Sequence, residues 1–133
     1  MSTENHEIVR RAIDAYNRRD LDAMLREWAP DAVVDWSNSR GVEARVYRGD
    51  EEIRIFAERF FETFGEGQVE IVELDEIEPG VLIVDNLTRF RGREGIEVEA
   101  RAAFLITVRG GVQTSLTLYQ SKAEALAAAG HSE

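Results

Sequence analysis

The sequence predicts an α+β domain in which three N-terminal helices pack against a mostly antiparallel sheet. Two observations predict this class. Apolar residues recur at helical spacing over most of the chain before residue 65, and they alternate with a period near two after it. Because no linker, internal repeat or low-complexity segment separates the two parts, we expect residues 1–133 to form a single domain with one shared core.

The first two helices are expected within residues 2–31. Apolar residues from Ile8 to Tyr16 recur on one helical face. A shorter helix should follow, with Asp20 as its N-cap, Trp28 on its apolar face and Pro30 just beyond its end.

The third helix is expected to start at the acids of "DEE" (50–52), which suit the positive end of a helix dipole, and to stop at Gly65. It carries an aromatic stripe that includes Phe56, Phe60 and Phe64. Such a stripe is more often core than a cofactor site, but it can also wall a cavity.

Strands account for most of the remaining chain. "AVVDW" (32–36) reads as a strand, followed by a long polar loop that reaches "VYRG". Four alternating segments between residues 68 and 121, separated by "EPG", "GREG" and "RGG", predict an antiparallel meander. "KAEALAAAGHSE" predicts a short final helix that Gly130 stops.

Composition limits the classes of partner. The chain has 16 Lys and Arg against 26 Asp and Glu, a net charge of −10, which repels nucleic-acid phosphates and anionic membranes. It has no apolar leader or span, so we expect a cytoplasmic protein. It has no cysteine, no glycine-rich phosphate loop, and two histidines, His6 and His131, without ligand-like spacing; we therefore expect no metal and no cofactor.

Alternation predicts which strand residues face the interior. Burying unpaired charges such as Glu97, Glu99 and Arg101 would be costly, so the opposite, apolar face should look inward. The expected inner residues are Val84, Asn86, Thr88, Phe90, Val98, Ala100, Ala102, Phe104, Ile106, Thr114, Leu116 and Leu118. The expected outer residues of the last strand are Gln113, Ser115, Thr117 and Tyr119.

The order of elements, with "YNRRDLDAMLREWAPDAVVDW" (16–36), "YRGDEEIRIF" (47–56) and "LYQSKAEALAAAG" (118–130), resembles the NTF2-like superfamily, in particular its SnoaL-like (polyketide cyclase-like) branch. The resemblance covers nearly the whole chain. It implies a cone-shaped, cystatin-like fold, with a strongly bent sheet wrapped around the first helix and an apolar cavity open at one end. It also implies dimerisation through the outer sheet face.

The reaction groups of known members do not transfer. By this resemblance, the general base of ketosteroid isomerase-like members falls on Trp36, their strand acid near Ala102 and their helix-one tyrosine near Ala12, and none of these residues has the required group. The Asp-Arg-Asp set of limonene epoxide hydrolase-like members also finds no match. The resemblance therefore predicts a fold, not a reaction.

Asp35 is the candidate catalytic residue, and two interpretations of it remain open. Apolar neighbours such as Trp36 would raise its pKa and allow it to act as a base. Alternatively, it is a solvated residue at the end of a strand.

The candidate ligand-binding residues are Tyr16, Trp36, Tyr47, Arg48, Phe60, Asn86, Thr88, Ala102, Phe104 and Leu116. Several have structural alternatives. Tyr47 and Arg48 could hold a ligand carbonyl or carboxylate, or fix the loop onto the third helix. Asn86 could bind a ligand or pair with backbone, and Tyr16 could be core.

Two functions follow as hypotheses. The first is binding of a small hydrophobic, flat or polycyclic molecule, with acid/base isomerisation, cyclisation or dehydration if Asp35 faces the cavity. The second is a non-catalytic ligand-binding or dimerisation module. We expect a homodimer through the outer face around Ser115, Ala103 and Leu105, with Arg101 and Glu99 paired across the axis. An open cavity with an inward carboxylate would favour catalysis, and an apolar lining would favour the module.

Overall fold

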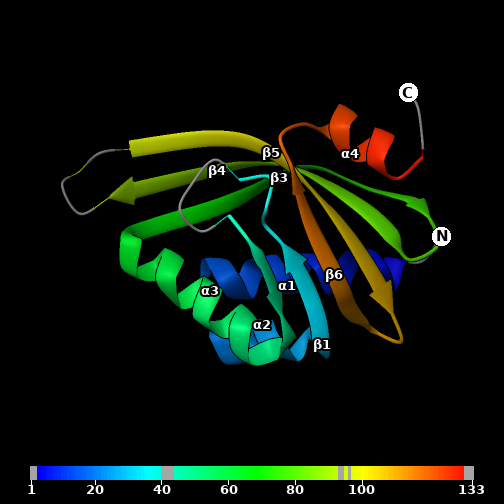
Figure 1. The fold of residues 1–133 in the computed structure, drawn as a ribbon, viewed down its shortest axis with the longest axis horizontal. Helices are drawn as coiled ribbons and strands as arrows, with labels where there is room; N and C mark the ends of the chain where they lie inside the picture. Colours follow the sequence, from blue (N-terminus) through cyan, green and yellow to red (C-terminus); the bar gives the residue numbers. More distant parts are fainter. Residues whose placement is uncertain (1–2, 40–43, 93–94, 96, 131–133) are drawn as a thin grey trace.

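The computed structural model describes residues 3–39, 44–92, 95 and 97–130. Its helices are α1 (Thr3–Asn17), α2 (Leu21–Arg26), α3 (Gly49–Thr63) and α4 (Lys122–Ala128). Its strands are β1 (Trp28–Asp35), β2 (Val46–Arg48), β3 (Phe64–Glu78), β4 (Val81–Gly92), β5 (Glu97–Arg109) and β6 (Val112–Tyr119) (Figure 1). Residues 40–43 of the predicted long loop, residues 93 and 94 of "GREG", and His131 lie outside the described residues.

The strands form one curved sheet in the order β2-β1-β6-β5-β4-β3. Strands β3 to β6 are the predicted antiparallel meander. β1 pairs in parallel with β6, and β2 pairs antiparallel with β1 at the sheet edge. The predicted α+β class with a mostly antiparallel sheet is confirmed, and the parallel β1–β6 contact closes the meander onto the N-terminal half.

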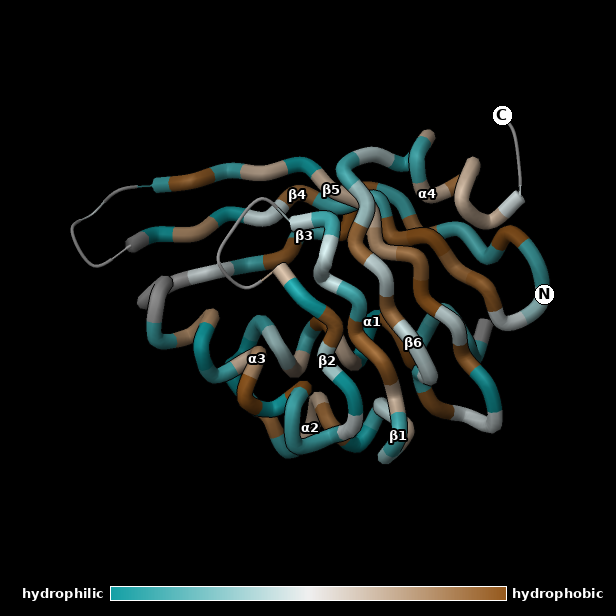
Figure 2. Tube along the Cα trace, viewed as in Figure 1, coloured by the Kyte–Doolittle hydropathy of each residue, from teal (hydrophilic) through white to brown (hydrophobic). Residues whose placement is uncertain are grey.

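The helices lie on two sides of the sheet. Figure 1 shows α1, α2 and α3 on the concave side and α4 alone on the other side. Figure 2 shows hydrophobic residues along the strands where they pass over the first three helices. Val9 of α1 and Val84 of β4 are fully buried there and belong to the same apolar cluster. The interior predicted from alternation is therefore the space between the sheet and α1–α3.

The second helix is shorter than its apolar pattern predicted. Asp20 is its N-cap, as predicted, and accepts a hydrogen bond from the Ala23 backbone N–H at 3.1 Å. Trp28, however, is the first residue of β1, where it pairs with Gln113. The prediction that Trp28 continues the helix was wrong because strand pairing with β6 outweighs the helical spacing. Pro30, which offers no backbone N–H, lies in the stretch where the β1–β6 register shifts.

The third helix begins as predicted. Gly49 has φ +85°, a left-handed conformation that glycine adopts without strain, and it follows directly on β2. The Glu52 carboxylate accepts a hydrogen bond from the Arg48 backbone N–H at 2.8 Å, which secures the first turn. The helix ends at Thr63, and Phe64 begins β3 instead of closing the helix.

Alternation predicted the facing of β4 and β5 correctly, and that of Leu116 and Leu118 on β6, but failed at the start of β6. Thr107 pairs with Ser115 and Val108 pairs with Gln113, so Thr114 is the extra residue of a bulge. Gln113 was expected outside, and it is 1 % exposed on the inner side. Thr114 was expected inside, and its hydroxyl lies 2.6 Å from that of Thr107. One inserted residue accounts for both corrections.

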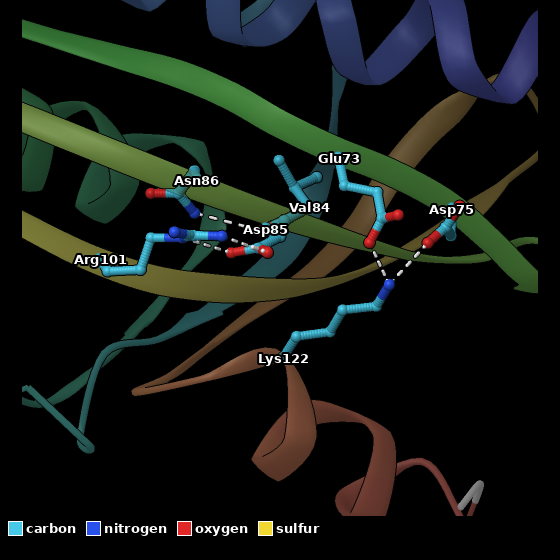
Figure 3. A network of polar contacts seen from close by, with 7 residues as sticks. All are labelled: Glu73, Asp75, Val84, Asp85, Asn86, Arg101 and Lys122. Atoms are coloured by element: carbon cyan, nitrogen blue, oxygen red, sulfur yellow. Dashed lines mark hydrogen bonds and ion pairs between the residues drawn. The ribbon is translucent and has the colours of Figure 1, made fainter. Parts of the chain in front are cut away.

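Helix α4 covers part of the outer sheet face. Ala125 of α4 is fully buried against Ile83 and Ala103. The Lys122 ammonium at the start of α4 contacts the carboxylates of Glu73 and Asp75 on β3, with the Asp75 oxygen at 2.9 Å (Figure 3). Hydrogen bonding to Glu73 is the main cause that raises the pKa of Lys122. The helix is therefore held by both apolar packing and charge.

This packing corrects the dimer surface that the sequence suggested. Ala103 has no exposed surface because α4 lies over it. Arg101 forms two hydrogen bonds with Asp85 of its own chain, at 2.9 and 2.8 Å (Figure 3). These bonds hold the pKa of the Asp85 carboxyl below its usual range. Glu99 likewise pairs with Arg89 at 3.0 Å within the chain.

Candidate functional site

A cavity of about 520 Å³ lies between the inner sheet face and helices α1 and α3. α1 contributes Ala12 and Tyr16, and α3 contributes Phe56 and Phe60. From the sheet come Thr88, Ala102, Phe104 and Leu116, four of the predicted ligand-binding residues. The helices and the bent sheet together therefore enclose a mostly apolar space, of the size typical of small-molecule sites.

Aromatic rings form one wall of the cavity. The Trp36 ring lies 5.1 Å from Phe56 and 5.9 Å from Phe60, both in edge-on arrangements. It also lies 5.7 Å from Phe104 on β5. Such contacts between centroids are in the range where aromatic pairs attract beyond their burial alone. The wall is thus a cluster of aromatic rings in mutual contact, built from β5, α3 and the residue after β1.

The cavity has a closed end and an open end. Met24 is 5 %, Trp28 9 % and Gln113 1 % exposed, and the pairing of Trp28 with Gln113 joins them across β1 and β6. At the other end Val98 is 45 % exposed and Arg59 is also exposed. A ligand would therefore enter past the start of β5 and reach inward toward α2.

Tyr16 faces this interior. Its ring packs against Phe61 at 5.2 Å, and burial raises the pKa of its hydroxyl to about 12. The phenol is therefore neutral at physiological pH and keeps its hydrogen.

Thr88 and Asn86 take different places although both are on the predicted inner face. Thr88 lines the cavity and donates its hydroxyl hydrogen to the Asn86 side-chain oxygen at 3.0 Å. Asn86 is fully buried beneath the lining and donates to the Val84 carbonyl at 3.1 Å. Asn86 is therefore paired with backbone, one of the two alternatives that the sequence left open, and its side-chain oxygen holds the Thr88 hydroxyl.

Asp35 lies at the end of β1 and does not line the cavity. Its Oδ1 accepts hydrogen bonds from the Ser37 N–H at 3.0 Å and the Ser37 hydroxyl at 2.5 Å. Among the described residues, no acidic side chain lines the cavity. This geometry matches the strand-end interpretation of Asp35, and a catalytic role for it stays a prediction.

Tyr47 and Arg48 also lie away from the lining. Tyr47 has no exposed surface, its ring packs at 4.5 Å on Phe56, and the Arg45 guanidinium stacks 4.7 Å above it. The Arg48 side chain is exposed. The two residues therefore join β2 to α3, which is the structural alternative that the sequence left open.

Gln113 is the site residue that sequence reasoning missed. Counting inward positions back from Leu118 and Leu116 leads to Thr114, and no residue type around it signals a bulge. The described part of the chain offers no hydrogen-bond partner to either polar atom of the Gln113 side chain. The same described part contains no group of three or more metal-ligating side chains.

Fold and cavity together define a small α+β protein with an internal apolar cavity. The family model described as SnoaL-like domain matches residues 9–115, so the chain belongs to the SnoaL-like domain family. This confirms the predicted membership of the NTF2-like superfamily. No curated protein is significantly similar to the chain in sequence. No helix among the described residues combines the length and apolar character needed to cross a bilayer.

Solved structures show the same fold at low sequence identity. An NTF2-like protein of unknown function from Burkholderia pseudomallei K96243 is 21% identical, with a TM-score of 0.79 and coverage of 96% of this chain and 97% of that one. TerC co-crystallised with polyporic acid is 16% identical, with a TM-score of 0.79 and coverage of 89% and 92%. Rv0760c from Mycobacterium tuberculosis, in complex with estradiol-17β-hemisuccinate, is 16% identical, with a TM-score of 0.78 and coverage of 90% and 95%.

Proposed function

We propose that the chain binds a small, flat, mostly apolar molecule in the cavity between the sheet and α1–α3. The observation that carries this proposal is a cavity of about 520 Å³ lined mostly by apolar side chains, with the Trp36 and Phe56 rings along one wall. Removing apolar ligand surface from water would supply most of the binding free energy. The ligand-bound neighbours TerC and Rv0760c support the same use of the fold.

Binding without acid/base chemistry is the form of the proposal that the lining favours. Proton transfer needs a group within hydrogen-bond reach of the reacting atom and a pKa near the working pH. Asp35 is bonded to Ser37 outside the lining, and the pKa of Tyr16 is about 12. Neither meets both conditions.

A fluorescence titration tests the proposal. N-phenyl-1-naphthylamine is neutral, apolar and bright only when shielded from water, and we expect it to saturate at one probe per chain. Ala102→Trp places an indole into the cavity from β5 and should weaken probe binding by at least about tenfold, because the added ring takes the ligand's volume.

Ala128→Trp is the matched control, because it adds the same ring at an exposed position of α4. It should leave the probe affinity as in the wild type. Equal weakening by both variants, or no saturable binding by the wild type, would contradict the proposal.

Asp35→Asn separates binding from catalysis. The asparagine oxygen can still accept the Ser37 N–H bond, so we expect the melting temperature to stay close to the wild-type value and the probe affinity to stay within about twofold of wild type. Turnover of any substrate later assigned to the cavity should also persist. A turnover that Asp35→Asn abolishes at unchanged probe affinity would restore Asp35 as the catalytic base.

A homodimer in the cytoplasm is the remaining part of this proposal. α4 covers Ala103, so a second copy would have to use the uncovered part of the outer face, where Ser115 and Thr117 are half-buried. Their small side chains leave that part of the sheet flat enough for a two-fold interface.

A further inference from the structure

Gln113 lines the closed end of the cavity, and its side-chain amide is buried without a hydrogen-bond partner among the described residues. The residue is 1 % exposed, and neither its side-chain oxygen nor its side-chain nitrogen has a hydrogen-bond partner among the described residues. A buried amide without partners is destabilising, so such groups are rare in native proteins and an unpaired one needs a physical explanation. The buried carboxylate of Glu76 on β3 differs in this respect, because one of its oxygens accepts hydrogen bonds from the Asn5 side chain and the Gly80 N–H and the other lies 3.9 Å from His6 Nδ1.

The backbone fixes where this amide lies. The Gln113 N–H donates to the Glu27 carbonyl at 2.7 Å, and the residue pairs with Val108 on one side and Trp28 on the other. The bulge at Thr114 turns the side chain to the inner face. Three neighbouring segments thus hold the Gln113 backbone in place beside the cavity, so that only side-chain rotation is needed to bring its amide to a partner there.

We infer that Gln113 anchors the inner end of the bound molecule, and that this end carries a neutral group which both accepts and donates a hydrogen bond, such as a carboxamide or lactam. This inference rests on the proposed function, since it names the ligand class of the same cavity. The side-chain amide has one acceptor and one donor end, so a ligand amide satisfies both at once. A simple ether or hydrocarbon would leave at least one of them unpaired.

The surroundings of Gln113 require the group to be uncharged. The other buried residues at this end are apolar, namely Met24, Trp28 and Ile53. The arginines of the lining, Arg59 and Arg101, are exposed, and Arg101 is bonded to Asp85 on the outer face. A carboxylate at the closed end would therefore lose its hydration without gaining a cation.

Three naphthalenes of similar shape test the inference by displacement of N-phenyl-1-naphthylamine and by calorimetry. They are 2-naphthamide, its apolar isostere 2-isopropenylnaphthalene, and the anion 2-naphthoate. We expect Gln113→Met to weaken the binding of 2-naphthamide about tenfold, because this compound loses a hydrogen-bond partner. The affinity for 2-isopropenylnaphthalene should stay the same or improve, because this compound has no hydrogen bond to lose. At neutral pH wild-type protein should bind 2-naphthoate at least about tenfold more weakly than 2-naphthamide.

Gln120→Met is the matched control, because it makes the same change at a lining residue whose amide already donates to the Asn38 carbonyl at 2.7 Å. It should leave unchanged the ratio of the affinities for the two neutral compounds, 2-naphthamide and 2-isopropenylnaphthalene. Gln113→Leu provides a second variant with the same expectation should Gln113→Met fold poorly.

The inference is overturned if Gln113→Met changes the affinities for 2-naphthamide and 2-isopropenylnaphthalene by the same factor. It is also overturned if wild-type protein binds 2-naphthoate as well as 2-naphthamide. It is also overturned if the fluorescent probe binds wild-type protein but 2-naphthamide does not; the proposed function then stands without it. If neither the probe nor any naphthalene binds, the proposed function itself has failed.

Discussion

Replacing Tyr47 by alanine is expected to lower the free energy of unfolding by about 3–5 kcal/mol. The Tyr47 ring has no exposed surface and packs at 4.5 Å on Phe56, so truncation leaves a large hole behind the aromatic wall. Domains of this size are stable by only about 5–15 kcal/mol, so this is a major fraction of the total. Urea unfolding followed by Trp fluorescence measures the change.

Tyr47→Phe is the control for this experiment, because it keeps the ring and removes only the hydroxyl. We expect it to cost about 1 kcal/mol, the usual contribution of one hydrogen bond. If Tyr47→Ala costs no more than Tyr47→Phe, ring packing does not hold β2 against α3, and the ligand-contact interpretation of Tyr47 gains ground.

Replacing Gln113 by methionine is expected to stabilise the ligand-free protein, an unusual outcome because most substitutions destabilise. The variant exchanges a fully buried, unpaired amide for an apolar chain of similar shape, which removes a desolvation penalty of about 1–3 kcal/mol. For a chain of this length the melting temperature should rise by roughly 3–8 °C. Differential scanning calorimetry without ligand measures the shift.

Gln120→Met serves again for comparison, since its amide has a partner in the Asn38 carbonyl. It should lower the melting temperature or leave it unchanged. A lower melting temperature for Gln113→Met would mean that its amide is satisfied in solution. Stabilisation combined with weaker 2-naphthamide binding would show a polar group retained for function against stability.

Much of the fold followed from the sequence because local rules and tertiary packing agree in most segments. Alternation predicted the inner faces of β4 and β5, where Val84 and Phe104 are buried as expected. The capping role of Asp20 and the start of α3 followed from residue type alone. In these segments no distant contact opposes the local preference.

The predictions from sequence failed where pairing with a strand distant in the chain determines the local structure. Trp28 fits a helical pattern, but pairing with Gln113 places it in β1. The bulge at Thr114 depends on the registers of both β5 and β1, which one strand's sequence does not reveal. Both misjudged positions lie at the closed end of the cavity. That is why the sequence indicated an apolar cavity correctly and yet missed its polar anchor.

In the candidate site, too, local patterns were predicted correctly and the partners of polar residues were not. Trp36, Phe60, Ala102, Phe104 and Leu116 line the cavity as predicted, because strand alternation and the helical stripe are short-range signals. Whether a polar residue faces ligand or backbone depends on its partners. Asp35 accepts a hydrogen bond from Ser37, and Asn86 donates one to the Val84 carbonyl. Neither hydrogen bond could be predicted from the spacing of residues in the sequence.

A crystal structure of the wild-type protein with N-phenyl-1-naphthylamine bound would decide whether the cavity is a binding site. We expect electron density for the probe inside the cavity of about 520 Å³, against the Trp36 and Phe104 rings. A cavity closed by collapsed side chains, with the probe on the outer sheet face or nowhere, would contradict the proposed function.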